Sequence, residues 1–384
     1  MNNILAFQKC SNCGACYNVC PKDAITLDEG GLFYELRVDE DKCVDCGMCQ
    51  KVCPVNSPDN RQAVISAYGA IHNDAEVVKA SSSGGAFSAI AEFVLKNGGT
   101  VFGAAYTDDC RAVEICSSDH RTLDDFRRSK YVESKVGYTF REVKSMLDTS
   151  TEKPILYCGL PCQVAGLKRY LGKEYSNLFT CDFTCNGVPS HGIYREYLTN
   201  IEKKLKAKIC DVNFREKTYG WRHLSIRIVA NNGRKYHQLA MADPYFDCFI
   251  GSNHHSTVRE YCLTCDFANN HHADVILADF WKYQTISTMD NRDKGISLVI
   301  TNSAKGEMLM QAISKRVALT ALDLDKATYN LTEKSFSDDV LQRRNAFIEK
   351  VKRDGFVSAT KERKFKGVLK FKIKYMIKRI IGKA

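Results

Sequence analysis

Residues 10–21 read CSNCGACYNVCP, and residues 43–54 read CVDCGMCQKVCP. Both stretches follow the pattern C-x2-C-x2-C-x3-C-P, and the second repeats the first 33 residues later. A four-iron, four-sulfur cluster needs four thiolates, and this spacing supplies three from one tight loop and the fourth from elsewhere. In proteins with two such clusters, the last cysteine of each run binds the other cluster. The sequence therefore predicts two [4Fe–4S] clusters near the N-terminus.

The crossed pairing assigns four cysteines to each predicted cluster. The first cluster is expected to bind Cys10, Cys13, Cys16 and Cys53, and the second Cys43, Cys46, Cys49 and Cys20. Pro21 and Pro54 follow the fourth cysteine of each run, where a fixed φ and a missing N–H help to turn the chain away from the metal. Zinc ribbons also use C-x2-C pairs, but without a third cysteine at x2 spacing and a trailing proline. Disulfides would require an oxidising compartment.

Length and composition limit the classes of protein to which this chain can belong. The chain has 384 residues and 44% hydrophobic content, which allows two or three domains with proper cores. The N-terminus lacks a basic start and a long apolar stretch, so no signal peptide is expected. The 18 cysteines are therefore expected to be reduced, in the cytoplasm. No run of 18 apolar residues occurs, so no segment is expected to span a membrane.

The positive charge is concentrated at the C-terminus. Residues 361–384 contain ten Lys or Arg and one Glu, which accounts for +9 of the formal net charge of +10. The rest of the chain is nearly neutral, which argues against a nucleic-acid-binding face. As a helix this tail would be amphipathic and basic, and we expect peripheral contact with the inner face of a membrane. Docking to an acidic partner and a solvated end are alternatives, and the alternation over residues 371–375 also fits a strand.

A hairpin and a linker are expected around the second cysteine run. Residues 24–27 and 33–36 are short alternating stretches that flank a turn with two glycines, which predicts a β-hairpin. Residues 56–61 are polar and rich in turn formers, and we expect them to link the cluster module to the rest of the chain.

A Ser/Gly-rich loop precedes a predicted helix. Residues 81–87 read SSSGGAF, between a predicted strand at 64–70 and helical periodicity up to residue 97, and a second strand is expected at 100–106. Such a loop offers free N–H groups, hydroxyls and a positive dipole end to a phosphate. The alternative is an N-capped helix with glycine for close packing. The basic stretch 126–132, ahead of a predicted helix at 139–147, fits either a nucleotide clamp or a solvated loop.

Several cysteines lie where predicted strands end. Strands that run into turns are expected within 154–163, 178–189 and 274–281, with a helix at 164–171, and open α/β sheets place ligands at such strand ends. The six cysteines in these turns are Cys158, Cys162, Cys181, Cys185, Cys262 and Cys265. They exceed what one cluster can use, and spacing neither selects four of them nor excludes zinc. We expect Cys110, Cys116, Cys210 and Cys248 to be ordinary small apolar residues.

In combination, these motifs resemble the beta-subunit family of coenzyme F420 hydrogenase and dehydrogenase, in the branch with a fused two-cluster ferredoxin. Beyond the doubled cysteine pattern, the similar motifs are Ser82–Phe87, Ser129–Val132, Leu160–Gln163, Cys185–Ser190, Cys262-x2-Cys265 and Asp279–Trp281. The resemblance covers the chain up to about residue 350. It implies an α+β ferredoxin-like dicluster domain over 1–58, a larger α/β flavoprotein domain over 59–355, and a basic amphipathic tail over 356–384.

The same resemblance implies cofactors and the residues that bind them. It implies FAD with a third [4Fe–4S] cluster close to it. The implied ligands of the third cluster are Cys162, Cys185, Cys262 and Cys265, which leaves Cys158 and Cys181 as extra cysteines. The residues implied to contact the flavin nucleotide are Ser82, Ser83, Gly84, Gly85, Ser129, Lys130 and Tyr131.

The implied activity is that of an oxidoreductase. A flavin can join single-electron transfer by iron–sulfur clusters to hydride transfer with a deazaflavin such as coenzyme F420. We expect a ferredoxin or other redox partner protein at the clusters and a small hydride donor or acceptor at the flavin. The family also includes a reductase that acts on a chlorophyll, so the scaffold does not fix the substrate. A relay subunit without its own reaction, or a scaffold protein, are the alternatives. Asp279, His271 and His272 are candidates for proton transfer by position only.

Overall fold

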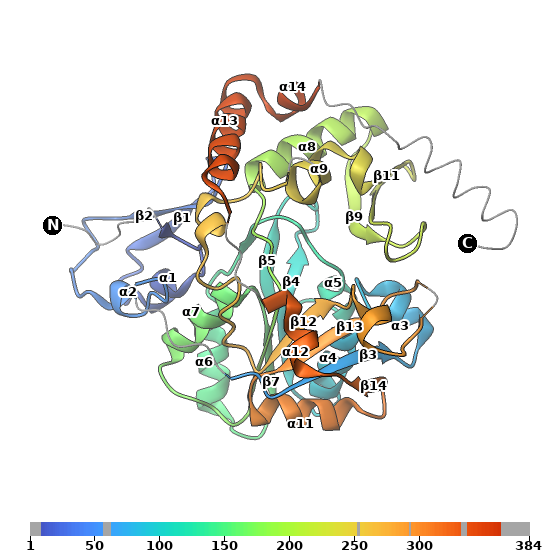
Figure 1. Cartoon of the computed structure of the whole chain (residues 1–384). Coiled ribbons are helices and arrows are strands. Elements are labelled where there is room, and N and C mark those ends of the chain that lie inside the picture. The colour runs from blue at the N-terminus through green and yellow to red at the C-terminus, as the bar shows by residue number, and fades with distance from the viewer. Residues whose placement is uncertain (1–8, 57–62, 252–253, 292, 332–335, 362–384) are drawn as a thin grey trace, which may run out of the picture.

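The computed structural model describes residues 9–56, 63–251, 254–291, 293–331 and 336–361 (Figure 1). The N-terminal segment, blue in Figure 1, lies at one side of a larger body. The predicted linker at 57–61 and the tail at 362–384 lie outside the described residues, and what the sequence suggests about them stays a prediction. Among the helices of the described ranges, none has the length and apolar character needed to cross a membrane.

The N-terminal segment consists of two short helices and a hairpin. Its elements are α1 (Ala15–Val19), β1 (Ile25–Asp28), β2 (Glu35–Val38) and α2 (Met48–Lys51). Each helix begins directly after a glycine with positive φ, Gly14 before α1 and Gly47 before α2. Because residues with a side chain rarely adopt this conformation, glycine allows the sharp turn that the cysteine loops make. The two strands pair antiparallel, which confirms the predicted hairpin.

A nine-stranded mixed sheet forms the centre of the larger body. Its strand order is β14-β3-β13-β12-β8-β7-β4-β5-β6. The strands are β3 (Ser66–His72), β4 (Thr100–Tyr106), β5 (Val113–Ser117), β6 (Ser134–Lys135), β7 (Ile155–Cys158), β8 (Leu178–Phe183), β12 (Val275–Asp279), β13 (Ser297–Thr301) and β14 (Val317–Ala321). Neighbours from β12 through β8 and β7 to β4 run parallel. The mixed α/β body and the ferredoxin-like segment confirm the coarse fold class.

Helices cover both faces of this sheet. They are α3 (Ala75–Ala80), α4 (Ala86–Lys96), α5 (Leu123–Phe126), α6 (Thr139–Thr149), α7 (Pro161–Leu171), α10 (Tyr283–Ile286), α11 (Ala304–Ile313) and α12 (Leu324–Ala327). On β7, Ile155 and Tyr157 pack in the core that contains α6 and α7, while Leu156 and Cys158 pack with α4 and α11. This alternation is the period of two that a strand imposes.

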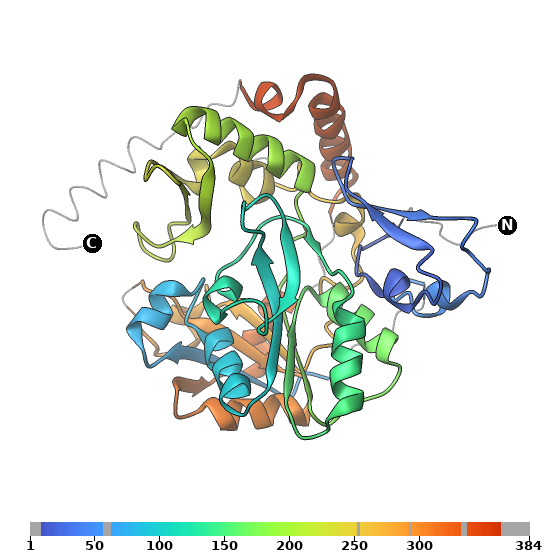
Figure 2. The same cartoon turned by 180° about the vertical axis from the view of Figure 1, so that it is seen from behind.

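A smaller sheet and four helices form a separate layer. The sheet has the order β11-β10-β9, from β9 (Ile209–Glu216), β10 (Ser225–Ala230) and β11 (Lys235–Leu239). The helices are α8 (His191–Leu205), α9 (Pro244–Ile250), α13 (Asp338–Asp354) and α14 (Phe356–Thr360), and short 3-10 turns are η2 (Ala240–Ala242) and η3 (Glu260–Thr264). Another 3-10 turn, η4 (Thr328–Leu331), packs beside α12 against the nine-stranded sheet instead. Figures 1 and 2 show this layer at the top, above the nine-stranded sheet. Pro189 and Val258 form a β-bridge, and Tyr261 shares one core with the N-terminal segment and with strands of the nine-stranded sheet.

One prediction about the cysteines is wrong. Cys110 and Cys248 are buried, as expected of small apolar residues, and Cys116 is partly buried. Cys210 is exposed. It follows Ile209 at the start of β9, and Ile209 takes the core position. Because successive side chains of a strand point to opposite faces, Cys210 is directed outward.

A buried charge network joins the N-terminal segment to the larger body. The Glu133 carboxylate is almost fully buried and lies 2.7 Å from the Arg259 guanidinium. It also lies 3.2 Å from His191 Nδ1, and it accepts a hydrogen bond from the Tyr34 backbone N–H at 3.3 Å. The Tyr34 and His191 rings stack with centroids 3.7 Å apart. Since Tyr34 belongs to the N-terminal segment, this network fixes the position of that segment.

We expect Glu133→Gln to destabilise the protein by roughly 3–5 kcal/mol, because it leaves the Arg259 charge buried without its carboxylate. The midpoint of urea unfolding, measured without oxygen by circular dichroism, checks this. The control is Glu114→Gln, which removes a carboxylate that pairs with Lys135 at 2.8 Å and is 45% exposed. An exposed pair contributes about 0–1 kcal/mol. Equal losses in both variants would contradict the role given to Glu133.

Candidate iron–sulfur sites and cofactor cavity

The structure brings together the four cysteines predicted for the first cluster. They are Cys10, Cys13, Cys16 and Cys53, three around α1 and one directly after α2. Burial raises the pKa of Cys13 to about 12, and the nearby charges of Cys10 and Cys53 add to this rise. Burial, together with Cys10, Cys13 and Cys53, likewise raises the pKa of Cys16. Since buried thiols resist ionisation, four thiolates in one place need a cationic partner such as a metal cluster.

The second predicted set lines one small cavity. Its members are Cys20, Cys43, Cys46 and Cys49. The Ala24 backbone N–H donates to the Cys20 sulfur at 3.3 Å. Cys49 is buried, whereas Cys46 is exposed, so this set lies at the surface. Cys20 comes from the first cysteine run and Cys53 from the second, which is the arrangement that the crossed pairing predicts.

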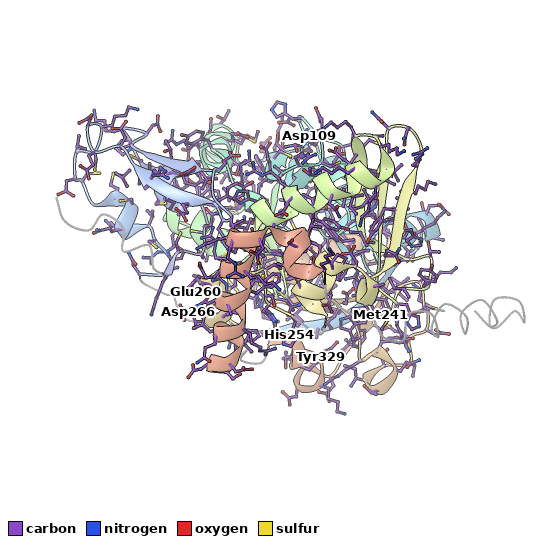
Figure 3. All side chains as sticks on the ribbon, turned by 90° about the horizontal axis from the view of Figure 1, so that it is seen from above. Asp109, Met241, His254, Glu260, Asp266 and Tyr329 are labelled. Atoms are coloured by element: carbon purple, nitrogen blue, oxygen red, sulfur yellow. The ribbon has the colours of Figure 1, made fainter. Side chains whose placement is uncertain are left out.

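Four of the six remaining candidate cysteines line a further small cavity. They are Cys162, Cys185, Cys262 and Cys265. Cys162 is the second residue of α7, Cys185 follows β8, and the other two belong to η3 and its end. Glu260 and Asp266, which flank these last two cysteines, are labelled in Figure 3. Cys158 and Cys181 lie opposite each other on β7 and β8 instead, away from this cavity. The structure therefore places together the four cysteines implied by the family resemblance.

The cysteine pattern bears on whether a site would hold zinc or an iron–sulfur cluster. In the described ranges, no three Cys, His, Asp or Glu side chains gather as one ion requires. A zinc site holds its sulfur ligands about 2.3 Å from the metal. A cluster of four irons is a larger body with one thiolate per corner. The doubled C-x2-C-x2-C-x3-C-P spacing of the first two sets is the pattern of cluster sites rather than of zinc sites.

The first and third cysteine sets lie against each other. The Cys162 thiol is 3.9 Å from the Ser11 carbonyl oxygen, which belongs to the first cysteine run. Gly166 lies four residues after Cys162 in α7, and a Cβ atom added to this glycine would lie 3.0 Å from the Cys13 sulfur. The negative charge of Cys13 also raises the pKa of Cys162, after burial and Cys265. The two sets are therefore direct neighbours across α7.

A much larger cavity of about 520 Å³ opens next to the third set. Six of the seven residues implied to contact a flavin line it, namely Ser82, Ser83, Gly85, Ser129, Lys130 and Tyr131. Gly84 does not line the cavity but packs against β3: a Cβ atom added to this glycine would lie 2.2 Å from the Ala70 carbonyl oxygen. The two stretches meet directly, because the Ser82 and Ser129 hydroxyls are 3.0 Å apart. Gly85, with φ +89°, precedes α4, so the N-terminus of α4 borders the cavity as the Ser/Gly loop predicts.

Basic side chains surround the same cavity. Arg127, Arg128, Lys130 and Arg215 all line it. Burial lowers the pKa of Lys130 to about 7, and its amine donates to the Arg127 carbonyl at 2.8 Å. The guanidinium of Arg215 forms two hydrogen bonds with the Asp279 carboxylate, at 2.7 and 2.9 Å. Arg127 pairs with Asp124 and Glu92, and Arg128 with Asp211, but these carboxylates do not line the cavity. At the cavity wall itself the basic side chains outnumber the acidic ones, which suits an anionic ligand.

The structure separates the three candidates for proton transfer. Asp279 lines the cavity but is engaged by Arg215 and by the Trp221 indole N–H at 3.1 Å. His271 and His272 are buried and do not line the cavity. His271 Nδ1 lies 2.8 Å from Asp182 Oδ1. Asp279 thus remains the candidate with access to a ligand.

The third cysteine set and the large cavity share a wall. Cys185 and the three residues after it line both spaces, as does Leu160. The Gly187 backbone N–H donates to the Cys185 sulfur at 3.4 Å. A cluster in the small cavity and a ligand in the large one would be separated by this short stretch of chain.

Sequence reasoning missed several residues of this region. Arg215, Glu133 and Arg259 carry buried charges, yet each pairs with a residue more than 50 positions away. Tyr329 and Phe249 also line the cavity. The arginine within the strand-like stretch 211–215 could have indicated a buried ion pair, because a buried charge needs a partner of opposite charge.

Comparisons with known proteins agree with this geometry. Residues 9–57 match the family model described as 4Fe-4S dicluster domain. Residues 152–327 match the family model for the C terminus of the coenzyme F420 hydrogenase/dehydrogenase beta subunit. The chain thus combines a match to a 4Fe–4S dicluster domain with a match to the C terminus of this beta-subunit family. The predicted resemblance is confirmed.

Two further comparisons concern curated proteins and solved structures. No curated protein was found to match the chain. A solved structure, the xenon-derivatised F420-reducing [NiFe] hydrogenase complex from Methanosarcina barkeri, is similar with 14% identity and a TM-score of 0.47. The similarity covers 77% of this chain and 95% of that one.

The part that matches the beta-subunit family contains only some of the site. All four cysteines of the third set lie within residues 152–327, as do Arg215, Arg259 and Asp279. The Ser82–Gly85 loop and the Ser129–Tyr131 stretch precede it. The chain is thus an iron–sulfur electron-transfer protein related to the beta-subunit family, and its large cavity is built from residues inside and outside the matched range.

In protein free of cofactor, Lys130→Met is expected to change the dependence of stability on pH. The folded pKa is about 7, whereas that of an unfolded lysine is about 10.4. Between these values the unfolded chain binds a proton that the folded chain has lost, so the unfolding free energy rises with pH. Removing the amine should flatten this rise and stabilise the protein at pH 7 and below by roughly 1–3 kcal/mol.

Urea midpoints from pH 6 to pH 10 test this expectation. The control is Lys135→Met. Burial lowers the pKa of Lys135, but hydrogen bonds to Glu114 and Glu29 outweigh this effect and raise that pKa overall. Its stabilising contribution is lost only above the unfolded value, so this variant should keep the slope between pH 7 and pH 10. An unchanged slope in Lys130→Met would show that its amine stays protonated in the folded protein.

Proposed function

We propose that this chain is an iron–sulfur flavoprotein oxidoreductase with three [4Fe–4S] clusters and one FAD. In this proposal, electrons pass between a redox partner protein at the clusters and a small hydride donor or acceptor, such as coenzyme F420, at the cavity. The observation that carries the proposal is the wall shared by the two spaces, in which Cys185 lines both. A flavin would supply the exchange between single-electron and hydride transfer.

The third cysteine set supports a cluster beside the cavity. Its four side chains come from three elements and converge on one small space. Burial raises the pKa of Cys262, the charges of Cys185 and Cys265 add to the rise, and Arg259 opposes it. Arg259 therefore lies where it compensates negative charge on the bound thiolates. Without a bound metal, four buried thiols in one place would contribute little to the stability of the fold.

The residues around the large cavity fit FAD. The N-terminus of α4 and the Ser82–Gly85 loop would hold phosphate oxygens through N–H groups and hydroxyls. Arg127, Arg128 and Lys130 would compensate the phosphate charge. Apolar residues such as Ile115 and Phe126 line the remaining wall and exclude water. The proposed binding residues are those that the family resemblance implies, apart from Gly84, whose role is to bring the loop close to β3.

The second cysteine set is proposed to be where a partner protein docks. Cys46 is exposed, and so are Val44 at 59% and Met48 at 42% in the same loop. Exposed apolar side chains around a metal ligand suit a transient contact with another protein. The first set is more buried, and the third set lies behind it. Electrons would thus pass from the second set through the first to the third, or in reverse.

We expect Met48→Glu to lower the rate of electron uptake from a reduced [4Fe–4S] ferredoxin about tenfold, because it places a charge at the proposed contact. Reduction by dithionite should be unchanged, since a small reductant needs no docking surface. The measurement is stopped-flow absorbance of the clusters. Met308→Glu is the matched control, because Met308 is similarly exposed, at 49%, but lies on α11. A similar loss in both variants would argue against docking at Met48.

Anaerobic purification tests the cofactor set directly. The wild-type protein is expected to hold about twelve irons and one flavin, since three clusters carry four irons each. Cys185→Ala should lose about four irons, keep a flavin that a hydride donor still reduces, and block electron passage between flavin and the other clusters. Cys210→Ala removes an exposed cysteine outside all three sets and serves as the control. Stopped-flow traces with normal cluster reduction by the flavin in Cys185→Ala would remove the third cluster from the path.

A relay subunit is the second candidate function. The matching family model describes a beta subunit, which favours a role inside a larger complex. The same preparation separates the two candidates: turnover of reduced coenzyme F420 or another hydride donor by the isolated chain supports the enzyme. Bound flavin without such turnover supports the relay, and protein without flavin contradicts both.

A further inference from the structure

Ser11 belongs to the first cysteine run, yet it also lines the cavity of the third set. It lies between Cys10 and Asn12, and it is only 8% exposed. The residues that line that small cavity include Ser11 together with the four cysteines of the third set. Its carbonyl oxygen lies 3.9 Å from the Cys162 thiol. Ser11 is thus placed at the boundary between the two cysteine sets.

The Ser11 hydroxyl is buried without a hydrogen-bond partner among the described residues. Leaving such a group unpaired is energetically costly, and native proteins rarely do so. A group in the cavity that accepts a hydrogen bond would remove this cost. Sulfur atoms of a bound cluster are acceptors of this kind.

The second cysteine run shows that the loop itself does not need a serine. The residue that corresponds to Ser11, 33 positions later, is Val44. The next residues in the two loops, Asn12 and Asp45, have almost the same positive φ, 57° and 51°. Since the same loop conformation forms with a valine at this position, the hydroxyl of Ser11 is free to serve another purpose.

We propose that the Ser11 hydroxyl donates a hydrogen bond to a sulfur of the third cluster and raises its reduction potential. This inference rests on the third cluster of the proposed function. A reduced cluster carries one more negative charge than the oxidised one. A hydrogen bond to the more negative sulfur is stronger, so the donor stabilises the reduced state more. Ser11 would therefore make the third cluster a better acceptor for electrons from the first.

Cys13 is the competing acceptor for this hydroxyl. The Ser11 side chain lies near enough to Cys13 to lower the pKa of that thiol slightly, less than the backbone N–H of Ala15 does. Cys13 therefore already has a donor from its own loop. Backbone N–H groups also reach the third set: that of Gly187 donates to the Cys185 sulfur, that of Val188 lowers the pKa of Cys262, and those of Phe267 and Ala268 lower the pKa of Cys265. Cys162, the cysteine of the third set that contacts Ser11, has its pKa shifted chiefly by burial and by the other cysteines. The Ser11 hydroxyl would therefore add a donor on the Cys162 side of the third cluster.

The test is an anaerobic redox titration of each cluster, followed by electron paramagnetic resonance. The variant is Ser11→Val, which copies the residue of the second loop, and Ser11→Thr retains the hydroxyl as the matched control. The third-cluster signal is the one that Cys185→Ala lacks. We expect Ser11→Val to lower the equilibrium constant for reduction of the third cluster about tenfold, which is about 59 mV for one electron. Ser11→Thr should stay close to the wild type.

The outcomes separate this inference from the function on which it rests. If the wild type holds only about eight irons, as two four-iron clusters would, and Cys185→Ala removes no signal, the third cluster is absent and the proposed function fails. If all three clusters are present and Ser11→Val leaves the third potential unchanged, the inference is overturned. A shift confined to the first cluster also overturns it, because the hydroxyl then serves Cys13. The iron content of Ser11→Val must equal that of the wild type, so that a shift in reduction potential reflects the lost hydrogen bond and not a lost cluster.

Discussion

The close contact between the first cysteine loop and helix α7 determines how the rest of the site is arranged. At Gly166 the helix has no side chain, and a Cβ there would press against the Cys13 sulfur and Cβ at 3.0 and 3.2 Å. Glycine inside a helix costs roughly 1 kcal/mol relative to alanine. The close approach explains why it is present. Because α7 rises about 1.5 Å per residue, Cys162 lies about 6 Å before Gly166 along the same helix. The first and third sets can adjoin only because the helix surface is bare at this point.

Buried arginines complement this crowding of sulfur. Arg259 is held by Glu133, and its charge lowers the pKa of both Cys10, in the first set, and Cys262, in the third, against the larger rise that burial causes. Arg344, from α13, donates to the Val258 carbonyl and pairs with Glu260 at 3.2 Å, at the start of η3. Burying a cation is costly unless negative charge lies near it. The arginines and the thiolates therefore stabilise each other, and the carboxylate of Glu133 ties the arrangement to the N-terminal segment.

Local patterns in the sequence were sufficient for the cluster loops and for much of the sheet. The doubled cysteine run, the hairpin and strand 100–106 depend on neighbours in sequence, and these predictions agree with the structure. The choice of four cysteines among six depended on the family resemblance, since β7 and β8 place Cys158 and Cys181 side by side and away from η3 only in three dimensions. The exposure of Cys210 and the pairing of Arg215 with Asp279 are equally long-range. No local periodicity encodes them, because the contacts form only when distant strands meet.

The exposure of the three sets gives the proposed path a physical order. The exposed ligand is Cys46 in the second set, whereas Cys13 in the first and Cys162 in the third are buried. A protein carrying single electrons can reach only a cluster near the surface. A small molecule can enter a cavity that no protein could, and the 520 Å³ cavity lies at the opposite end, behind Cys185. In the proposed path, the fold would thus keep the two kinds of partner apart. Such separation is what a converter between single-electron and hydride chemistry requires, because direct contact between the two partners would bypass the cofactor that joins their reactions.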